Sequence, residues 1–407
     1  MYVMMITHFR IDMMSGTEKG TQMEAKLKLQ GRIDSANAEE TGRILMEGIE
    51  GADSAVIDCS ELEYISSAGL RAILRLRKSL PGGITMTNVS REVYEIFDMT
   101  GFVQMMNIQR AYRVLSVEGC EVIGEGANGI VYRIDPDTVV KVYKNTEDID
   151  TIHRERELSR NAFLLGVPTA IPYDVVMIDD GVHYGAVFEM LNAESYASLL
   201  IDGEKTIDEI AEMTAETLHS VHDAVPEEGF LPDKREEYFE KIDDIRDRIP
   251  PEQSEKILSM LKAMPHDPHM IHGDFHIKNI MVQNGESLII DMDTLAVGDP
   301  VFEFAAMYAA YLGFSEADPD NVMEFFGISK ETVTELWKAT LRAYFGNEAD
   351  AEAADKKIRL TAAVFLLSFM IRHTEREENF RSRLIEMNIK NIDRLIGEVD
   401  GLAIRKD

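Results

Sequence analysis

The chain has 407 residues, of which 45% are hydrophobic and 28% charged, and this composition excludes a mostly disordered or fibrous protein. No apolar run approaches the roughly 20 residues of a membrane-spanning helix, and the first residues lack the basic start and apolar core of a signal peptide. Two cysteines, Cys59 and Cys120, are too few for a disulfide framework, so we expect a cytoplasmic protein. At about 150 residues per domain, the length predicts two or three domains.

The net charge of −31 is distributed unevenly along the chain. Residues 1–117 carry 13 basic and 15 acidic side chains, whereas the remainder has a net charge of −29. This acidic excess argues against a nucleic-acid partner, because it would repel phosphates. It would attract a cationic substrate, although an acidic surface also serves solubility alone. The change in charge predicts a domain boundary near residue 117.

Residues 1–23 are rich in methionine without a clear period, and we expect a loosely ordered leader there. Alternating or helical apolar patterns then predict a strand at 26–31, a helix at 38–49, a strand at 54–59, a helix at 66–80, a strand at 84–89 and a helix at 93–99. This order of elements predicts a small α/β sandwich over residues 24–116.

A motif covers the end of the second predicted strand and the start of the following helix. It consists of residues 58–60, Leu62 and residues 64–70, with support from residues 100–102 and 106–108. In these residues the chain resembles the STAS domain, the fold of bacterial anti-sigma factor antagonists. The resemblance implies a protein partner and the phosphorylation of a serine at the helix start, which falls on Ser67. The family often has an acidic residue just before this serine, where this chain has Ser66.

Two interpretations of Ser67 remain open. A phosphate at a helix N-terminus is stabilised by free backbone N–H groups and by the helix dipole, and it would add about two negative charges to a partner-binding surface. Alternatively, Ser66 or Ser67 is simply the N-cap of the helix, which explains a serine there without any modification.

The second part of the chain begins with a glycine-rich loop between two predicted strands. It contains Gly124, Gly126 and Gly129, and Lys141 follows in a valine-rich strand. Glycines allow backbone N–H groups to approach phosphates, but they also serve ordinary tight hairpins. A Rossmann loop would open directly into a helix, and a Walker A loop would need a Gly-Lys-Ser/Thr sequence that is absent here.

A stronger signal lies in residues 270–281 and 288–293. Asp274, Asn279 and Asp291 provide oxygen ligands and one candidate base within a short stretch. Mg²⁺ prefers oxygen ligands and usually shares them with substrate phosphates. Phosphoryl transfer needs charge neutralisation and a group that orients the attacking hydroxyl.

Other polar residues of this stretch are expected to have local roles. His272 and His276 should hydrogen-bond the loop rather than bind zinc, which needs three or four convergent ligands. Asp293 is either a second metal contact or a solvated turn residue, and Glu303 should cap local backbone.

Together, residues 124–132, Lys141, residues 272–279, residues 290–293 and residues 298–300 resemble the aminoglycoside phosphotransferase and choline kinase-like branch of the protein-kinase fold. The motifs lie in kinase order over residues 118–407. The resemblance implies a bilobal, kinase-like fold with an N-lobe at 117–192, a helical C-lobe at 193–407, and ATP and Mg²⁺ as cofactors. Apolar residues at helical spacing agree with helices at 208–221, 330–345, 357–372 and 381–396.

The resemblance also implies a role for each matched residue. Asp274 would be the catalytic base, supported by Lys141 and Asn279, while Asn279 and Asp291 would hold the metal. Lys141 would hold the α- and β-phosphates and pair with a glutamate on the next helix, for which we choose Glu155, with Glu157 as the alternative. The complete nucleotide-binding set is Gly124, Gly126, Gly129, Val131, Lys141, Glu155, Glu189 and Leu191, with the backbone of residues 188–191 as the hinge that binds adenine.

The sequence thus predicts an ATP- and Mg²⁺-dependent phosphotransferase acting on an alcohol group, with a STAS domain for docking or regulation. The expected acceptor is a small hydroxylated molecule such as an amine or a sugar, which the His272-Gly273-Asp274 form of the loop favours. One alternative is a protein-serine kinase, with Ser67 as a candidate target. Another is a scaffold that senses nucleotide without catalysis. We expect neither a nucleic-acid nor a membrane partner.

Overall fold

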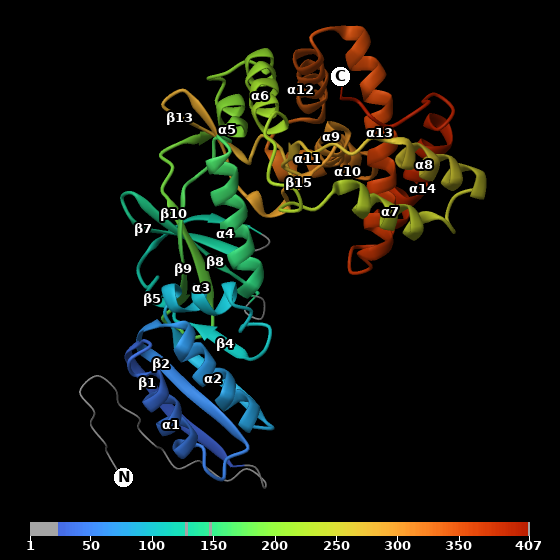
Figure 1. The fold of residues 1–407 in the computed structure, drawn as a ribbon. Coiled ribbons are helices and arrows are strands. Elements are labelled where there is room, and N and C mark those ends of the chain that lie inside the picture. Colours follow the sequence, from blue (N-terminus) through green and yellow to red (C-terminus); the bar gives the residue numbers. More distant parts are fainter. Residues whose placement is uncertain (1–22, 127–128, 146–148, 406–407) are drawn as a thin grey trace. The chain divides into compact units, whose positions relative to one another are not determined.

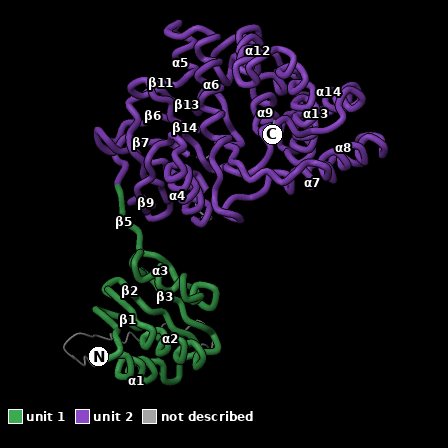
Figure 2. The backbone as a smooth tube through the Cα atoms, turned by 45° about the horizontal axis from the view of Figure 1, so that its top comes forward, with its two compact units in different colours: residues 1–115 green, residues 116–407 purple. Residues whose placement is uncertain are grey.

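The structure is a computed structural model that describes residues 23–126, 129–145 and 149–405. The chain forms two compact units, residues 1–115 and residues 116–407 (Figure 2). Both combine helices and sheets, as predicted, and the C-terminal part of the second unit is mainly helical (Figure 1). The leader predicted over residues 1–23 lies outside the described residues except for Met23. The limits predicted for the domains and lobes remain predictions.

The first unit is built on a parallel sheet in the order β1-β2-β3-β4. Its strands are β1 (Glu24–Ile33), β2 (Ser54–Ile65), β3 (Gly83–Val89) and β4 (Asn107–Arg110). Helices α1 (Ala38–Gly48), α2 (Ser67–Ser79) and α3 (Arg91–Met99) form the connections, because parallel neighbours need a crossover. Leu29 and Ile57 of the sheet and Ile73 and Phe97 of the helices are fully buried.

The prediction missed part of this sheet. Strand β2 continues beyond Cys59 to Ile65, and β4 had no predicted counterpart. The short β5 (Arg113–Leu115), which is not a strand of this sheet, was not predicted either. The register between β1 and β2 is irregular after Lys28, and Leu62 and Ile65 are still buried in the continuation of β2. Strand β4 is too short to show a period of two.

The second unit begins with an antiparallel sheet in which the order is β9-β10-β8-β7-β6. These strands are β6 (Glu121–Glu125), β7 (Gly129–Asp135), β8 (Thr138–Tyr143), β9 (Pro172–Ile178) and β10 (Tyr184–Glu189). Helix α4 (Ile149–Leu164) packs beside β9 and β10 (Figure 1). It buries Ile152, Leu158 and Ala162, but also the charged Glu155.

Short strands and helices then build the rest of the unit. The strands are β11 (Glu194–Ser195), β12 (Met270–Ile271), β13 (Ile280–Gln283), β14 (Glu286–Ile289) and β15 (Ala296–Val297). The helices are α5 (Tyr196–Ile201), α6 (Ile207–His222), α7 (Lys234–Ile245), α8 (Pro251–Ala263), α9 (Pro300–Tyr308), α10 (Phe314–Ala317), α11 (Asn321–Phe326), α12 (Lys330–Phe345), α13 (Glu348–Arg372) and α14 (Glu378–Leu395), with a 3₁₀ turn η1 (Met292–Thr294) and a π-helical turn η2 (Ala309–Gly313).

Aromatic side chains form the centre of the helical core. Trp337 of α12 is fully buried, with the rings of Phe304, Tyr308 and Tyr311 edge-on to it. Such edge-to-face pairs contribute beyond their buried area. Among the helices of the described residues, none is both long and apolar enough to cross a lipid bilayer.

Candidate active site

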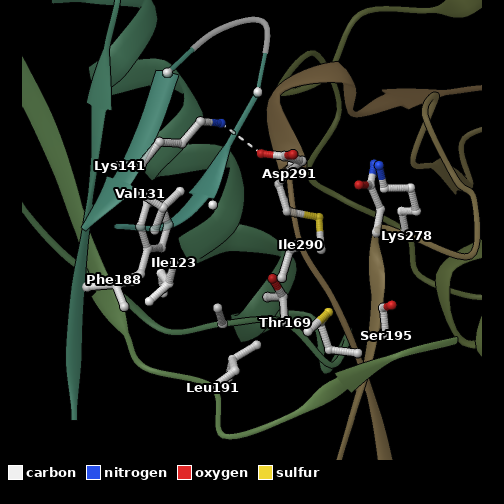
Figure 3. A pocket seen from close by; sticks show the side chains of 18 of the residues that line it. Ile123, Val131, Lys141, Thr169, Phe188, Leu191, Ser195, Lys278, Ile290 and Asp291 are labelled. Carbon is white, nitrogen blue, oxygen red and sulfur yellow. Dashed lines mark hydrogen bonds and ion pairs between the residues drawn. The ribbon is translucent and has the colours of Figure 1, made fainter. Parts of the chain in front are cut away.

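A cavity of about 640 Å³ opens between the antiparallel sheet and the loops around β13 and β14 of the second unit (Figure 3). Its volume is in the range of sites for small ligands, about 300 to 1,000 Å³. The cavity gathers residues from widely separated parts of the chain. Every site residue predicted in this unit lines it: Gly124, Gly126, Gly129, Val131, Lys141, Glu155, Glu189, Leu191, Asp274, Asn279 and Asp291.

Lys141 of β8 is held between two carboxylates. Its Nζ lies 2.8 Å from Oε1 of Glu155 on α4 and 2.7 Å from Oδ1 of Asp291 (Figure 3). The hydroxyl of Tyr143 donates a hydrogen bond of 2.7 Å to the other Glu155 oxygen. Burial disfavours the ammonium, yet Glu155 and Asp291 together raise the pKa of Lys141, so the side chain is charged. Glu157, the alternative partner, contacts Arg156 instead.

The carboxylates outnumber the ammonium at this end of the cavity. Asp293 lies two residues after Asp291, and its pKa is raised to about 6 by burial and then by the negative charge of Glu155. Asp291 itself adopts a positive φ of 62°, a conformation that aspartate tolerates better than most residues. Three carboxylates facing one lysine are an arrangement that an added cation would stabilise.

Glu303 fixes the loop that carries Asp274. It is fully buried at the start of α9, and its two carboxylate oxygens accept the backbone N–H groups of His272 and Gly273. Glu303 thus caps backbone, as predicted, but that of a loop 30 and 31 residues earlier in the chain rather than local backbone. Burial acts to raise the pKa of Glu303, but His222, whose Nε2 lies 3.7 Å from Oε2 of Glu303, and the nearby His272 outweigh it and lower the pKa.

Gly273 is required by the same loop. Its φ is +87°, and a Cβ there would lie 2.7 Å from the carbonyl oxygen of Thr294. His272 spans the loop as expected: its Nδ1 accepts the Asp274 N–H, and its Nε2 lies 3.2 Å from the carbonyl oxygen of Ile290. With Nδ1 as acceptor, the hydrogen-bond network assigns the proton to Nε2.

Asn279 is oriented by the backbone and side chain of Asp274. Its Nδ2 donates to the carbonyl oxygen at 3.0 Å and to Oδ2 at 3.3 Å. This orientation leaves the amide oxygen Oδ1 as an acceptor for a metal ion. Within the described ranges, no group of three His, Cys, Asp or Glu side chains is placed to hold a metal. Asn279 and Asp291 nevertheless fit Mg²⁺, which takes one or two protein carboxylates and completes its shell with water and phosphate oxygens.

The glycine-rich hairpin has one glycine that the fold itself requires. A Cβ on Gly129 would lie 2.5 Å from the carbonyl oxygen of Val142, so close pairing of β7 with β8 explains this residue. A Cβ on Gly126 would meet nothing within 4 Å, so packing does not explain that glycine. Two further residues of the predicted loop, 127 and 128, lie outside the described residues.

The hinge is only partly available to a nucleotide. The backbone N–H of Glu189 donates to the carbonyl oxygen of Ile171, and that of Met190 donates to Asp137. The Glu189 side chain accepts the Ile171 N–H at 2.8 Å. If residues 188–191 bind adenine, these hydrogen bonds leave the backbone N–H of Leu191 as the hinge donor.

Several lining residues were not predicted: Ile123, Thr169, Ala170, Ser195, Lys278, Met281 and Phe325. Lys278 and Met281 lie in residues 270–281, but no role was predicted for them, and the others come from segments without a motif. Ser195, for example, precedes a short helix, and Phe325 lies 47 residues after its contact Lys278. No pattern in the sequence indicates that these segments converge.

The remaining predicted site residue, Ser67, belongs to the first unit. Ser66 is the N-cap of α2 and accepts the Gly69 N–H at 3.3 Å. Ser67 is the first residue of the helix, and its side chain is exposed. Capping therefore accounts for Ser66 and not for Ser67.

Comparison with known proteins assigns both parts of the chain. The family model of the phosphotransferase enzyme family (APH) matches residues 119–344, and that of the STAS domain matches residues 19–114. A putative anti-sigma factor antagonist, BtrV of Bordetella bronchiseptica, is 36% identical over 84 residues, which are 20% of this chain and 72% of that protein.

Two solved structures are similar at low identity. A ternary complex of aminoglycoside phosphotransferase APH(4)-Ia with AMP-PNP and hygromycin B is 13% identical, covers 70% of this chain and 94% of its own, and has a TM-score of 0.48. A choline/ethanolamine kinase family protein from Mesorhizobium loti is 16% identical, with coverages of 70% and 89% and a TM-score of 0.44. From the family matches, the chain belongs to the phosphotransferase enzyme family and carries a STAS domain in its N-terminal part.

Proposed function

We propose that the protein is an ATP- and Mg²⁺-dependent phosphotransferase that transfers the γ-phosphoryl group of ATP to the hydroxyl of a small acceptor. The STAS domain then serves as a docking or regulatory module. The observation that carries this proposal is the position of the Lys141 ammonium. It lies between Glu155 and Asp291 in the cavity that also contains Asp274 and Asn279.

Each of these side chains has a task that its chemistry suits. Lys141 and the N–H groups of the glycine hairpin bind the phosphates of ATP, and Glu155 keeps the ammonium in place. Asn279 Oδ1 and Asp291 hold Mg²⁺, which when bound neutralises phosphate charge. Burial of Glu155, with 4% of its side chain exposed, makes the position of Lys141 well defined.

Asp274 acts on the acceptor. Its side chain is 52% exposed and lines the cavity, so it is accessible to a hydroxyl group. The carboxylate accepts a hydrogen bond from that hydroxyl and orients the oxygen toward the γ-phosphorus. As the new P–O bond forms and the bond to the ADP oxygen breaks, the hydroxyl proton passes to Asp274.

The test is to measure ADP release and the intact mass of the protein after incubation with ATP and Mg²⁺. Asp274→Ala and Asp274→Asn should lower turnover by about 100-fold or more, the usual size of an acid–base contribution. The matched control is Asp247→Asn at an exposed turn residue after α7. Turnover at the wild-type rate in Asp274→Ala contradicts the proposal. ATP binding by the wild type without turnover on any acceptor favours a nucleotide-sensing scaffold.

A second candidate function is a protein-serine kinase that acts on Ser67. It is favoured by the start of α2, where Ser66 forms the cap and leaves Ser67 exposed. A phosphate on Ser67 would meet the free N–H groups of the first helical turn. The same mass measurement separates the two functions. A gain of one phosphoryl group that is lost in both Asp274→Ala and Ser67→Ala supports the kinase, whereas an unchanged mass together with ADP release supports a small acceptor.

A further inference from the structure

The cavity contains a second lysine that the proposed phosphate-binding set does not use. Lys278, labelled in Figure 3, lies four residues after Asp274. Both side chains are exposed and line the same cavity. The ammonium donates one hydrogen bond of 3.1 Å to the carbonyl oxygen of Phe325. It also lies 4.7 Å from the centre of the Phe325 ring. An ammonium has three N–H donors, so this contact leaves donors for a ligand.

Lys278 lacks the carboxylate partners that balance the charge of other lysines near the cavity. Lys141 contacts both Glu155 and Asp291, and Lys144 contacts Glu125 at 3.3 Å. In the described part of the chain, no carboxylate lies within ion-pair distance of Lys278. A lysine without a counter-charge in a concave site attracts an anion.

The carboxylates that line the cavity are mostly engaged elsewhere. Glu155 and Asp291 contact Lys141, Glu125 contacts Lys144, and Glu189 accepts the Ile171 N–H. Among the described lining residues, Asp274 is therefore the acid left for the acceptor. A polycationic acceptor that binds this single carboxylate would enter the same cavity as the positive Lys278, which repels it.

An aromatic surface lies beside Lys278. The Phe325 side chain on α11 is 44% exposed and lines the cavity. Edge-on contacts fix its ring, with centroid distances of 5.4 Å to His276 and 4.6 Å to Phe326. His276 is itself buried, and its Nε2 lies 3.8 Å from Oδ1 of Asp274. Base, cation and aromatic ring thus belong to one connected wall.

We propose that the hydroxyl acceptor is an anion, a hydroxylated carboxylate or phosphate ester whose negative group binds Lys278 while its carbon skeleton lies against Phe325. This inference rests on the proposed phosphotransferase function and specifies its substrate class. The net charge of −29 beyond residue 117 acts on cations at long range, but surface fields are screened beyond about 8 to 10 Å in physiological salt. The charge of Lys278, in the same cavity as Asp274, then decides which acceptor is retained.

The test compares matched acceptors in a steady-state assay of ADP release. Glycerate is paired with glycerol, glucose 6-phosphate with glucose, and serine with ethanolamine, so that each pair differs in its anionic group. We expect the wild type to use the anionic member of at least one pair with a kcat/KM at least tenfold higher. Lys278→Gln should raise KM for that acceptor about tenfold and leave KM unchanged for the partner that lacks the anionic group. Lys278→Arg should retain the preference, and Lys262→Gln, at an exposed position of α8, is the control.

A binding measurement on the ADP-loaded protein covers acceptors that bind without reacting. Calorimetric affinities for the same compounds should fall only for the anionic members in Lys278→Gln. The inference is overturned by any of three outcomes: equal affinity for both members of every pair, a preference for ethanolamine over serine, or anion binding that is unchanged in Lys278→Gln. A uniform fall in kcat with all acceptors, including slow hydrolysis by water, also overturns it and assigns Lys278 to the γ-phosphate. A wild-type protein that does not bind ATP, or that turns over no acceptor, instead contradicts the proposed function.

Discussion

The cavity of the second unit and the start of α2 in the first unit hold polar groups in place over very different distances along the chain. Lys141 meets Asp291 across 150 residues, whereas Ser66 accepts a hydrogen bond from a residue three positions later. The Lys141–Glu155 pair is buried, with side-chain exposures of 13% and 4%, whereas Asp291 is 44% exposed. Breaking the buried pair leaves Glu155 charged and away from water, which costs more than losing a solvated cap.

The largest effect is expected from Lys141→Met. Nucleotide binding should be lost, because the phosphates lose their ammonium and face the carboxylates of Glu155 and Asp291. The buried Glu155 also loses its partner, so the free energy of unfolding should fall by about 3 to 5 kcal/mol. Urea titration and calorimetric ATP binding measure the two effects, with Lys262→Met as the control.

A second substitution separates the two effects of Lys141→Met. Adding Glu155→Gln removes the unpaired charge, so the double variant should recover part of the stability but none of the ATP affinity. If the single and double variants have equal free energies of unfolding, an unpaired Glu155 carries no cost. The burial of the ion pair would then not distinguish the cavity from the start of α2.

Glu303→Ala should have the next largest effect. It leaves the buried N–H groups of His272 and Gly273 without an acceptor, at about 1 to 3 kcal/mol each. Glu303→Gln keeps one acceptor oxygen and should cost less. Thermal unfolding measures the difference, and ADP release reports whether the loop of Asp274 has moved. A Glu303→Ala protein as stable as Glu303→Gln contradicts the role given to the carboxylate.

The same residue predicts a dependence on pH. The pKa of Glu303 is lower in the folded protein than its ordinary value of 4.5. Its contribution to stability is therefore fully present above pH 4.5 and is lost as the pH falls through the lower, folded-state pKa. Urea titrations at several acidic pH values should show a steeper loss of stability in the wild type than in Glu303→Gln. If the free energy of unfolding falls with pH equally in both proteins, Glu303 does not contribute to the loss of stability in acid.

The contrast between long-range and local contacts also explains what the sequence could predict. A cap at Ser66 or Ser67 follows from local rules, and the structure selects Ser66. The cavity residues could be predicted because the motifs that contain them lie in the order of the family that they resemble. By contrast, Phe325 is positioned next to Lys278 by the packing of α11, and no local rule encodes that contact. The amides of Glu189 and Met190 are likewise engaged by Ile171 and Asp137, which are distant in sequence.

The smallest effect is expected at α2, where two adjacent serines provide a matched pair. Ser66→Ala removes the acceptor of the Gly69 N–H and should lower the free energy of unfolding of the first unit by about 1 kcal/mol. Ser67→Ala removes an exposed side chain that caps nothing and should change it by less than about 0.5 kcal/mol. Hydrogen exchange of the α2 amides measures both changes in the intact protein. If Ser67→Ala instead destabilises α2 as much as Ser66→Ala, then Ser67 shares the cap, and its exposure no longer favours a role as a phosphorylation site.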